Sequence, residues 1–291
     1  MPGLREKKTP SLPKRHHFVP QMILKRFTND RGKLHYFDKR VPGGEIGETS
    51  PKNLFVEKHL YSEILPDGSK DPTLEQELSS LETRAEEVVD KIVATAKAGN
   101  APRLTLAEKK TWDTFLGMQL KRLPHIYDKH MTPDAFGESL DESIREYEEI
   151  IRPLTGRERD SFNDPEVRKR LMQNTRVGAI RGPMDLVMGE LGRRGLGTIV
   201  CAETKRSFVI GSNPVSKLTL PGRAHLSDPT TEVWFPIAAD VAVTPWGEKG
   251  RSILREAARE HVRHINLVTF KESDLVASRS EELIRSLKSP R

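Results

Sequence analysis

The sequence of 291 residues contains a single cysteine, Cys201. One thiol excludes an internal disulfide and a zinc site built on several cysteines. Because stable disulfides belong to oxidising compartments, we expect a reducing, cytoplasmic location. No stretch reaches the roughly 18 consecutive apolar residues of a membrane helix, and no apolar segment of signal-peptide type follows the first residues. We therefore expect neither membrane insertion nor a membrane partner.

A strong excess of one charge is also absent. The chain has 48 basic and 42 acidic residues, so its net charge of +6 is small beside the total. Such a weak basic excess favours nucleic acid or another polyanion as a partner only mildly. With 35% hydrophobic and 31% charged residues, the composition is typical of a globular chain with a very polar surface.

Several catalytic and binding motifs are missing. There is no Gly-x-x-x-x-Gly-Lys-Ser/Thr, Gly-x-Gly-x-x-Gly, Gly-x-Ser-x-Gly or His-Glu-x-x-His segment. These absences disfavour P-loop NTPases, dinucleotide-dependent oxidoreductases, α/β-hydrolases and common zinc proteases. No tandem zinc finger or RNA-recognition signature occurs either.

The pattern along the chain predicts an α+β fold. Residues 1–15 are rich in basic residues and proline, which indicates a disordered basic tail. We expect 16–291 to form a single domain, with a sub-division near 195 between a helical part, 72–194, and a strand-rich part, 195–291. A small helix-strand unit precedes the helical part.

Hydrophobic spacing, caps and turn residues predict the individual elements. The predicted helices cover 18–27, 72–99, 105–124, 133–151, a segment beginning at Asp164, 184–191, 251–263 and 272–287. The predicted strands cover 33–38, 197–202, 207–210, 232–237 and 241–244, and residues 41–71 are loop-rich.

The most distinctive stretch begins with adjacent histidines, His16 and His17. Such a pair can supply a metal ligand plus a general base, or two imidazoles that contact a phosphate. Alternatively, one ring is buried as a cap for the following helix and the other lies in solvent. Because adjacent side chains diverge on a helix, a shared ion requires an extended backbone here. We take both histidines as candidate catalytic residues.

This stretch and several later ones resemble domain of unknown function family 4238. The segments that carry the resemblance are His16-His-Phe-Val-Pro20, Gly32-Lys-Leu-His-Tyr-Phe-Asp-Lys39, Thr49-Ser-Pro-Lys-Asn53, Gln119-Leu-Lys-Arg-Leu-Pro124, Phe208-Val-Ile-Gly-Ser-Asn-Pro-Val215, Phe235-Pro-Ile237 and Ile265-Asn266. The resemblance covers most of the chain, but it implies no established fold, activity or ligand. One departure is Ser212, which stands where the family pattern has aspartate, so a metal ligand at that position would be lost.

The matched residues have competing roles. Arg122, at a helix end, can clamp a phosphate or a carboxylate, or it can contact the terminal carbonyls of its own helix. Asn213 before a proline is typical of a turn, and alternatively of a ligand-binding loop. Lys52 and Asn53 are candidate binding residues in the loop-rich region. His59, in a Glu-x-His segment, is with His17 a candidate metal ligand, although a solvated loop explains it equally.

Arginines recur every four residues near the C-terminal end of the sequence: Arg251, Arg255, Arg259 and Arg263. On one helix face such a row can track a phosphate backbone, which makes Arg255 and Arg259 candidate binding residues. Because Glu256 and Glu260 stand at favourable spacing, an ordinary salt-bridged surface helix is the alternative.

These observations favour two functions. The first is a metal-assisted phosphodiester hydrolase, nuclease-like, in which His17 is general base or ligand of a divalent Mg, Mn or Zn ion and Arg122 clamps the anion. The second is a non-catalytic regulatory protein that binds nucleic acid or another protein. A third interpretation gives His16, His17 and Pro20 a purely structural role. The sequence leaves the oligomeric state open.

Overall fold

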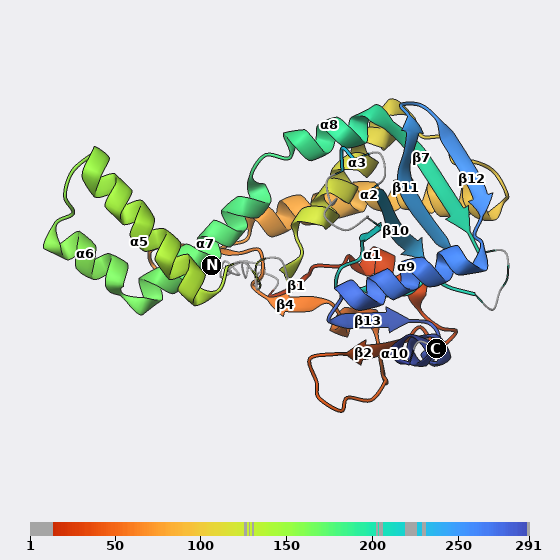
Figure 1. Cartoon of the computed structure of the whole chain (residues 1–291), viewed down its shortest axis with the longest axis horizontal. Coiled ribbons are helices and arrows are strands. Elements are labelled where there is room, and N and C mark those ends of the chain that lie inside the picture. The colour runs from red at the N-terminus through yellow and green to blue at the C-terminus, as the bar shows by residue number, and fades with distance from the viewer. Residues whose placement is uncertain are drawn as a thin grey trace, which may run out of the picture.

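The computed structural model describes residues 14–124, 127, 129, 131–201, 203, 206–218, 226–228 and 231–289. The predicted α+β class is confirmed: helices pack around two larger sheets, and a helical arm extends from this body (Figure 1). Most of the predicted basic tail, 1–13, lies outside the described residues.

The larger sheet has five strands. In spatial order they are β12 (Ser252–Glu256), β7 (Arg194–Val200), β11 (Val241–Glu248), β10 (Glu232–Ala238) and β9 (Ser216–Leu218). β12 runs parallel to β7, and the other neighbours are antiparallel. Gly195 allows β7 to approach the adjoining turn, because a Cβ there would lie 2.1 Å from the carbonyl oxygen of Arg251.

The second sheet joins segments from opposite ends of the sequence. Its antiparallel strands are β3 (Gly47–Thr49), β2 (Leu34–Asp38), β13 (Leu275–Ser278) and β8 (Ile210–Gly211), in that order. All four residues of β13 are buried. The first and last parts of the chain therefore share one sheet.

Short elements complete the N-terminal unit. They are β1 (Arg15–His17) paired with β4 (Val56–Lys58), β5 (Glu63–Ile64) paired with β6 (Lys70–Asp71), α1 (Gln21–Leu24), and the 3-10 helices η1 (Lys25–Phe27) and η2 (Pro51–Asn53). The predicted helix at 18–27 begins only at Gln21, because Pro20 is the extended N-cap residue. His16 and His17 lie before this helix, on the strand β1.

Three helices cover the five-stranded sheet: α2 (Thr73–Lys97), α3 (Leu106–Lys121) and α8 (Asp185–Arg193). α2 and α3 meet β10, where Trp112 and Phe115 of α3 stack on Phe235 with ring centroids 6.2 and 6.1 Å apart, and α8 meets β7. One hydrophobic core therefore includes residues from both sides of position 195. The predicted helices at 72–99, 105–124 and 184–191 are confirmed.

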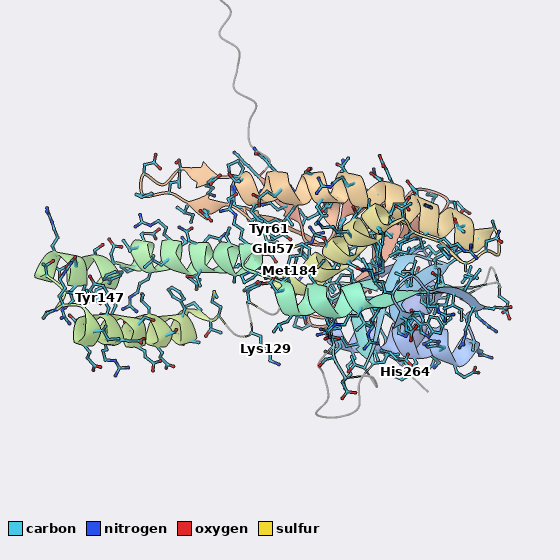
Figure 2. The ribbon with its side chains drawn as sticks, turned by 90° about the horizontal axis from the view of Figure 1, so that it is seen from above. Glu57, Tyr61, Lys129, Tyr147, Met184 and His264 are labelled. Atoms are coloured by element: carbon cyan, nitrogen blue, oxygen red, sulfur yellow. The ribbon has the colours of Figure 1, made fainter. Side chains whose placement is uncertain are left out.

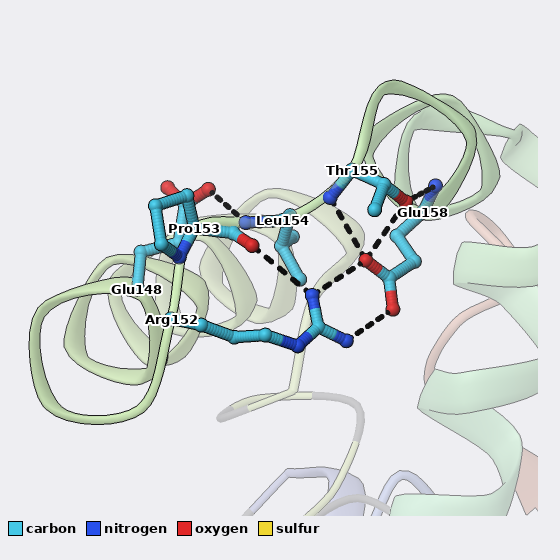
Figure 3. A network of polar contacts seen from close by, with 6 residues as sticks. All are labelled: Glu148, Arg152, Pro153, Leu154, Thr155 and Glu158. Carbon is cyan, nitrogen blue, oxygen red and sulfur yellow. Dashed lines mark hydrogen bonds and ion pairs between the residues drawn. The ribbon is translucent and has the colours of Figure 1, made fainter.

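The arm consists of α5 (Pro133–Ile150), α6 (Gly156–Asn163) and α7 (Pro165–Arg181), which point away from the sheets (Figure 1). The turn between α5 and α6 is held by Arg152, whose guanidinium donates to both carboxylate oxygens of Glu158 at 2.9 and 2.7 Å (Figure 3). These hydrogen bonds lower the pKa of Glu158 to about 2. The sequence predicted α5 and α7, but not α6.

Two predicted C-terminal helices are wrong in part. Residues 252–256 form β12, because they pair with β7 along the edge of the sheet, and the helix α9 (Arg259–Glu272) begins only afterwards. Likewise, 272–287 contains β13 before α10 (Glu281–Lys288), since a short buried apolar run has no clear helical or strand period. The predicted row of four arginines on one helix face therefore does not exist: Arg255 lies on β12 and Arg259 on α9.

The described residues include no helix with the length and apolar character needed to span a membrane.

Candidate functional site

A group of polar side chains lies inside the molecule, between the N-terminal strand and the helices. We call it the polar core cluster, and its members are His16, Tyr61, Glu75, Glu82, Gln119 and Arg122. His16 comes from β1, Tyr61 from the loop after β4, the two glutamates from α2, and Gln119 and Arg122 from the end of α3. The structure thus brings two of the predicted catalytic residues, His16 and Arg122, into one site.

Helical spacing explains how α2 and α3 supply their side chains. Glu75 and Glu82 are seven residues apart, two turns of α2, so they share a face beside the buried Leu78. Gln119 and Arg122 are three residues apart, and Arg122 is the C-cap residue of α3. Each helix therefore presents two polar groups to the same interior region.

His16 is completely buried and is fixed by a backbone contact. The amide N–H of Tyr61 donates to its Nδ1 at 3.0 Å, so this nitrogen is the acceptor in the neutral ring. The Tyr61 ring stacks on the imidazole with centroids 5.7 Å apart, and a Glu75 carboxylate oxygen lies 3.6 Å from Nδ1. This geometry gives His16 a positioning role within the cluster.

Arg122 is the buried cation of the cluster, with 1% of its surface exposed. Its guanidinium pairs with Glu82 at 2.7 Å and donates to the Gln119 side-chain oxygen at 3.3 Å. The carboxylate of Glu82 raises the pKa of Arg122 against the opposing effect of burial. The cation therefore keeps its charge inside the protein.

Three buried donors of the cluster have no hydrogen-bond acceptor within the described part of the chain. They are the Arg122 Nε, the Gln119 Nε2 and the Tyr61 hydroxyl. Burial raises the pKa of Tyr61, so its hydroxyl keeps its proton. Because buried polar groups in proteins are rarely left without partners, these donors indicate a place for an acceptor such as water or an anion.

Glu75 has a strongly shifted ionisation. Burial raises its pKa to about 7, and the neighbouring Glu82 carboxylate adds to this effect while Arg122 opposes it. The Glu75 and Glu82 side chains are 22% and 25% exposed, whereas the donors are almost fully buried. The carboxylates therefore form the solvent-facing side of the cluster.

His17 points to the opposite side of β1, since neighbouring strand residues alternate. Burial and the positive charges of Arg15 and Arg122 lower its pKa, although the backbone carbonyls of Pro51 and Lys52 favour the protonated ring. The imidazole is consequently neutral at pH 7. Its buried Nε2 makes no hydrogen bond within the described residues. His16 and His17 therefore do not converge on one ion.

The base of the arm holds the loop that carries Tyr61. Gln173 of α7 donates to the carbonyls of His59, Leu60 and Ser62 at 3.3, 3.2 and 3.0 Å. Glu57 and Tyr61 accordingly lie at the middle of the molecule, where the arm meets the body (Figure 2). The arm thus helps to shape the cluster.

The remaining predicted site residues lie in other surroundings. Lys52 is exposed on η2, and Asn53 braces that turn by donating to the Thr49 hydroxyl at 3.1 Å. Asn213 follows β8, and its N–H donates to the Ser273 hydroxyl at 3.0 Å. Arg255 and Arg259 are exposed on β12 and α9.

The predicted metal ligands are His17 and His59. The His59 ring meets the edge of His16, with centroids 6.3 Å apart. Across the described residues, no group of three or more His, Cys, Asp or Glu side chains is arranged to hold a metal ion. The metal site stays a prediction.

Ser212 occupies the position where the family pattern has aspartate. Its hydroxyl accepts the backbone N–H groups of Asp274 and Leu275 at 3.0 and 3.4 Å, at the start of β13. The oxygen at this position thus fixes a strand end.

A family model of proteins of unknown function, DUF4238, matches residues 15–282. The chain belongs to the DUF4238 family. The match includes every member of the polar core cluster, so in this DUF4238 protein the site lies inside the family region. No curated protein and no solved structure matches the chain.

The sequence interpretation missed Tyr61, Glu75 and Glu82. Glu75 directly follows the buried Leu74, and such a carboxylate beside an apolar stripe is also found on ordinary surface helices. The available signal was the seven-residue spacing of Glu75 and Glu82, which places both on one face of the predicted helix.

Proposed function

We propose that this DUF4238 protein is a hydrolase that cleaves phosphodiester bonds at the polar core cluster. The proposal rests on Glu75. Its side chain lies beside His16 and near the Arg122 guanidinium, and its pKa is raised to about 7. A carboxyl group with a pKa near 7 can take up and release a proton in the physiological range, as general acid–base catalysis requires.

The buried donors supply the second requirement, which is stabilisation of negative charge. Arg122 Nε, Gln119 Nε2 and the Tyr61 hydroxyl are fixed in place and have no acceptor within the described part of the chain. Preorganised donors in a buried site stabilise anionic oxygens far better than water-exposed ones do. A phosphoryl group has the acceptor oxygens to use all three.

In the proposed reaction, the Glu75 carboxylate takes a proton from a water molecule whose oxygen attacks phosphorus. One P–O ester bond breaks, and the leaving oxygen takes up the proton that Glu75 removed from water, which returns Glu75 to its carboxylate form. The products are an alcohol and a phosphate monoester. His16 positions Tyr61 through the hydrogen bond from the Tyr61 N–H to its Nδ1 and through the stacked rings.

A divalent ion remains part of the proposal. His17 is the proposed ligand, because a neutral imidazole keeps a lone pair on one nitrogen, here Nδ1, which lies 3.4 Å from the Gln21 side-chain nitrogen. An ion bound there would lie on the opposite side of β1 from His16, so the proposed proton transfer at Glu75 does not depend on it. A cytoplasmic location is proposed on the single cysteine, which is buried and whose pKa burial raises to about 11, so its thiol is unreactive.

The test compares Glu75→Gln with the wild-type chain on bis(p-nitrophenyl) phosphate, single-stranded DNA and RNA, each with EDTA, Mg²⁺, Mn²⁺ or Zn²⁺. We expect the substitution to lower the hydrolysis rate about 100-fold or more, since general acid–base groups contribute on that order. Glu87→Gln is the matched control, because Glu87 is an exposed glutamate of the same helix.

Absence of cleavage with every metal, or full activity of Glu75→Gln, would contradict the hydrolase. Binding of DNA or RNA without cleavage, with an affinity that falls steeply as salt rises, would support the non-catalytic alternative instead.

A further inference from the structure

We propose that a pocket between α9 and α10 binds a small phosphorylated molecule. The pocket has a volume of about 250 Å³, and its polar lining includes Arg206, Ser207, Arg259, Arg263 and Asn266. Arg206 comes from the segment before β8, whereas Arg259 and Arg263 lie one turn apart on α9. Three arginines from two separate segments thus line one concavity.

The charged residues that line this pocket, among those described, are all positive. Its described lining contains three arginines and no acidic residue. Arg206 pairs with Glu203 at 2.9 Å, but the side chains of Arg259 and Arg263 take part in no hydrogen bond or ion pair within the described part of the chain. Two cations are therefore available for an anionic ligand, and arginine matches phosphate oxygens well.

The start of α9 adds to this preference. Its N-cap residue is Ala258, which provides no side-chain acceptor for the first N–H groups of the helix. An uncapped helix start carries partial positive charge and favours an anion. Arg259 is the first residue of that helix, so the helix end and the arginine charge act in the same region.

Asn266 makes the floor of the pocket rigid. Its side chain accepts the N–H of Val209 at 3.0 Å and donates to the carbonyl of Ser207 at 2.9 Å, both in the interior. Its hydrogen-bonding groups are thus engaged by the backbone. The arginines are therefore the groups that bind the ligand, and they favour an anionic ligand over a neutral one.

Size and shape favour a small ligand. Ligand pockets for drug-sized molecules span roughly 300–1,000 Å³, and this one is slightly smaller. Val262, Leu283 and Leu287 form an apolar wall beside the arginines. A phosphate with a compact organic body, such as a pentose phosphate or a nucleoside monophosphate, has the matching chemistry. The described lining of this pocket shares no residue with the polar core cluster.

Titration calorimetry tests the proposal with inorganic phosphate, ribose 5-phosphate, adenosine 5′-monophosphate and ribose as probes. We expect the phosphorylated compounds to bind and ribose not to bind. Arg259→Gln combined with Arg263→Gln should weaken their binding about tenfold or more, because two charge-assisted hydrogen-bonding groups are lost. Arg285→Gln should leave binding unchanged, because that exposed arginine of α10 pairs with Glu281 outside the pocket.

Three results would overturn the proposal: none of the phosphorylated probes binds, the double variant binds as tightly as the wild type, or a short DNA or RNA binds while the small probes do not. Circular dichroism confirms that the variants are folded. Glu75→Gln should bind the probes normally, so failure of the pocket and failure of the hydrolase are separate outcomes.

Discussion

Glu75 links the stability of the fold to pH. Its pKa in the folded protein is about 7, compared with an ordinary value of 4.5. The folded chain therefore holds a proton that the unfolded chain releases between pH 4.5 and pH 7. Protonation of Glu75 stabilises the native state, and this contribution is complete below pH 4.5 and is lost as the pH rises through 7.

We expect Glu75→Gln to remove this pH dependence, because the amide resembles the protonated carboxyl. The free energy of unfolding of the wild-type chain should fall relative to that of Glu75→Gln between pH 5 and pH 8, by at most about 3 kcal/mol, since each pKa unit corresponds to about 1.4 kcal/mol. Partial exposure of Glu75 makes the actual difference smaller. Urea unfolding of both proteins at several pH values measures it.

His17 acts in the opposite direction and must be separated from Glu75. Its pKa is lowered, so its stabilising contribution is complete above its ordinary value of 6.5 and is lost as the pH falls through its folded pKa. Because both proteins contain His17, its contribution cancels when the free energy of unfolding of Glu75→Gln is subtracted from that of the wild type. A constant difference across the pH range would contradict the pKa assigned to Glu75.

Two helices begin with the same capping box, in very different surroundings. At α3 the pair is Thr105 and Glu108, and at α6 it is Thr155 and Glu158. α3 contributes Trp112 to the core, whereas α6 has no buried residue. Loss of the capping box should therefore weaken the core at α3 but only the arm at α6.

We expect Thr105→Ala to lower the free energy of global unfolding by about 1 kcal/mol, the usual loss for an N-cap. Thr155→Ala should increase hydrogen exchange only in the arm and leave the main thermal transition unchanged, because the core does not include α6. Calorimetry with site-resolved hydrogen exchange measures both. An equal fall in the main transition for both variants would contradict the independence of the arm.

The sequence predicted helices correctly where apolar residues recur at helical spacing over a long segment. α2 shows this plainly, since seven helically spaced apolar residues led to its correct bounds within two residues of Pro72 and Gly99. α6 was missed because eight mostly polar residues have no such period, although Thr155 and Glu158 gave the same capping signal as α3. β12 and β13 were missed because sheet pairing, and not local propensity, determines them.

The candidate site was predictable only in part. The adjacent histidines and the place of Arg122 at a predicted helix end drew attention to two of its members, His16 and Arg122, but their meeting depends on how segments distant in sequence pack together. Glu75 was unpredictable as an acid–base group, because its pKa arises from burial among segments distant in sequence. The divergence of His16 and His17 follows from the strand, which the predicted helix at 18–27 did not include.

At the scale of the whole molecule, close packing at Gly211 joins the second sheet to α9. A Cβ at this position would lie 2.1 Å from the Ser273 hydroxyl oxygen and 2.9 Å from the Thr269 side chain. β8 also contacts β13 through this residue. The site therefore tolerates no larger side chain without movement of the sheet or the helix.

We expect Gly211→Ala to destabilise the protein by about 1–3 kcal/mol, the range for overpacking a core. Gly189→Ala is the control, because a Cβ there has no neighbour within 4 Å and alanine favours the helix α8. Its melting temperature should stay the same or rise. A melting temperature of Gly211→Ala equal to that of the wild type would contradict the packing described for β8.

The placement of β13 between β2 and β8 has a consequence for synthesis of the chain. β2 ends at Asp38 and β13 begins at Leu275, so a ribosome makes β2 well before β13, and the edge of β2 that pairs with β13 has no neighbour while the residues between them are made. Pairing so distant in sequence is slow, and an open strand edge attracts other chains. The nascent chain therefore depends on β13 to complete the sheet that β2 begins, and a chaperone that covers β2 would act during that interval.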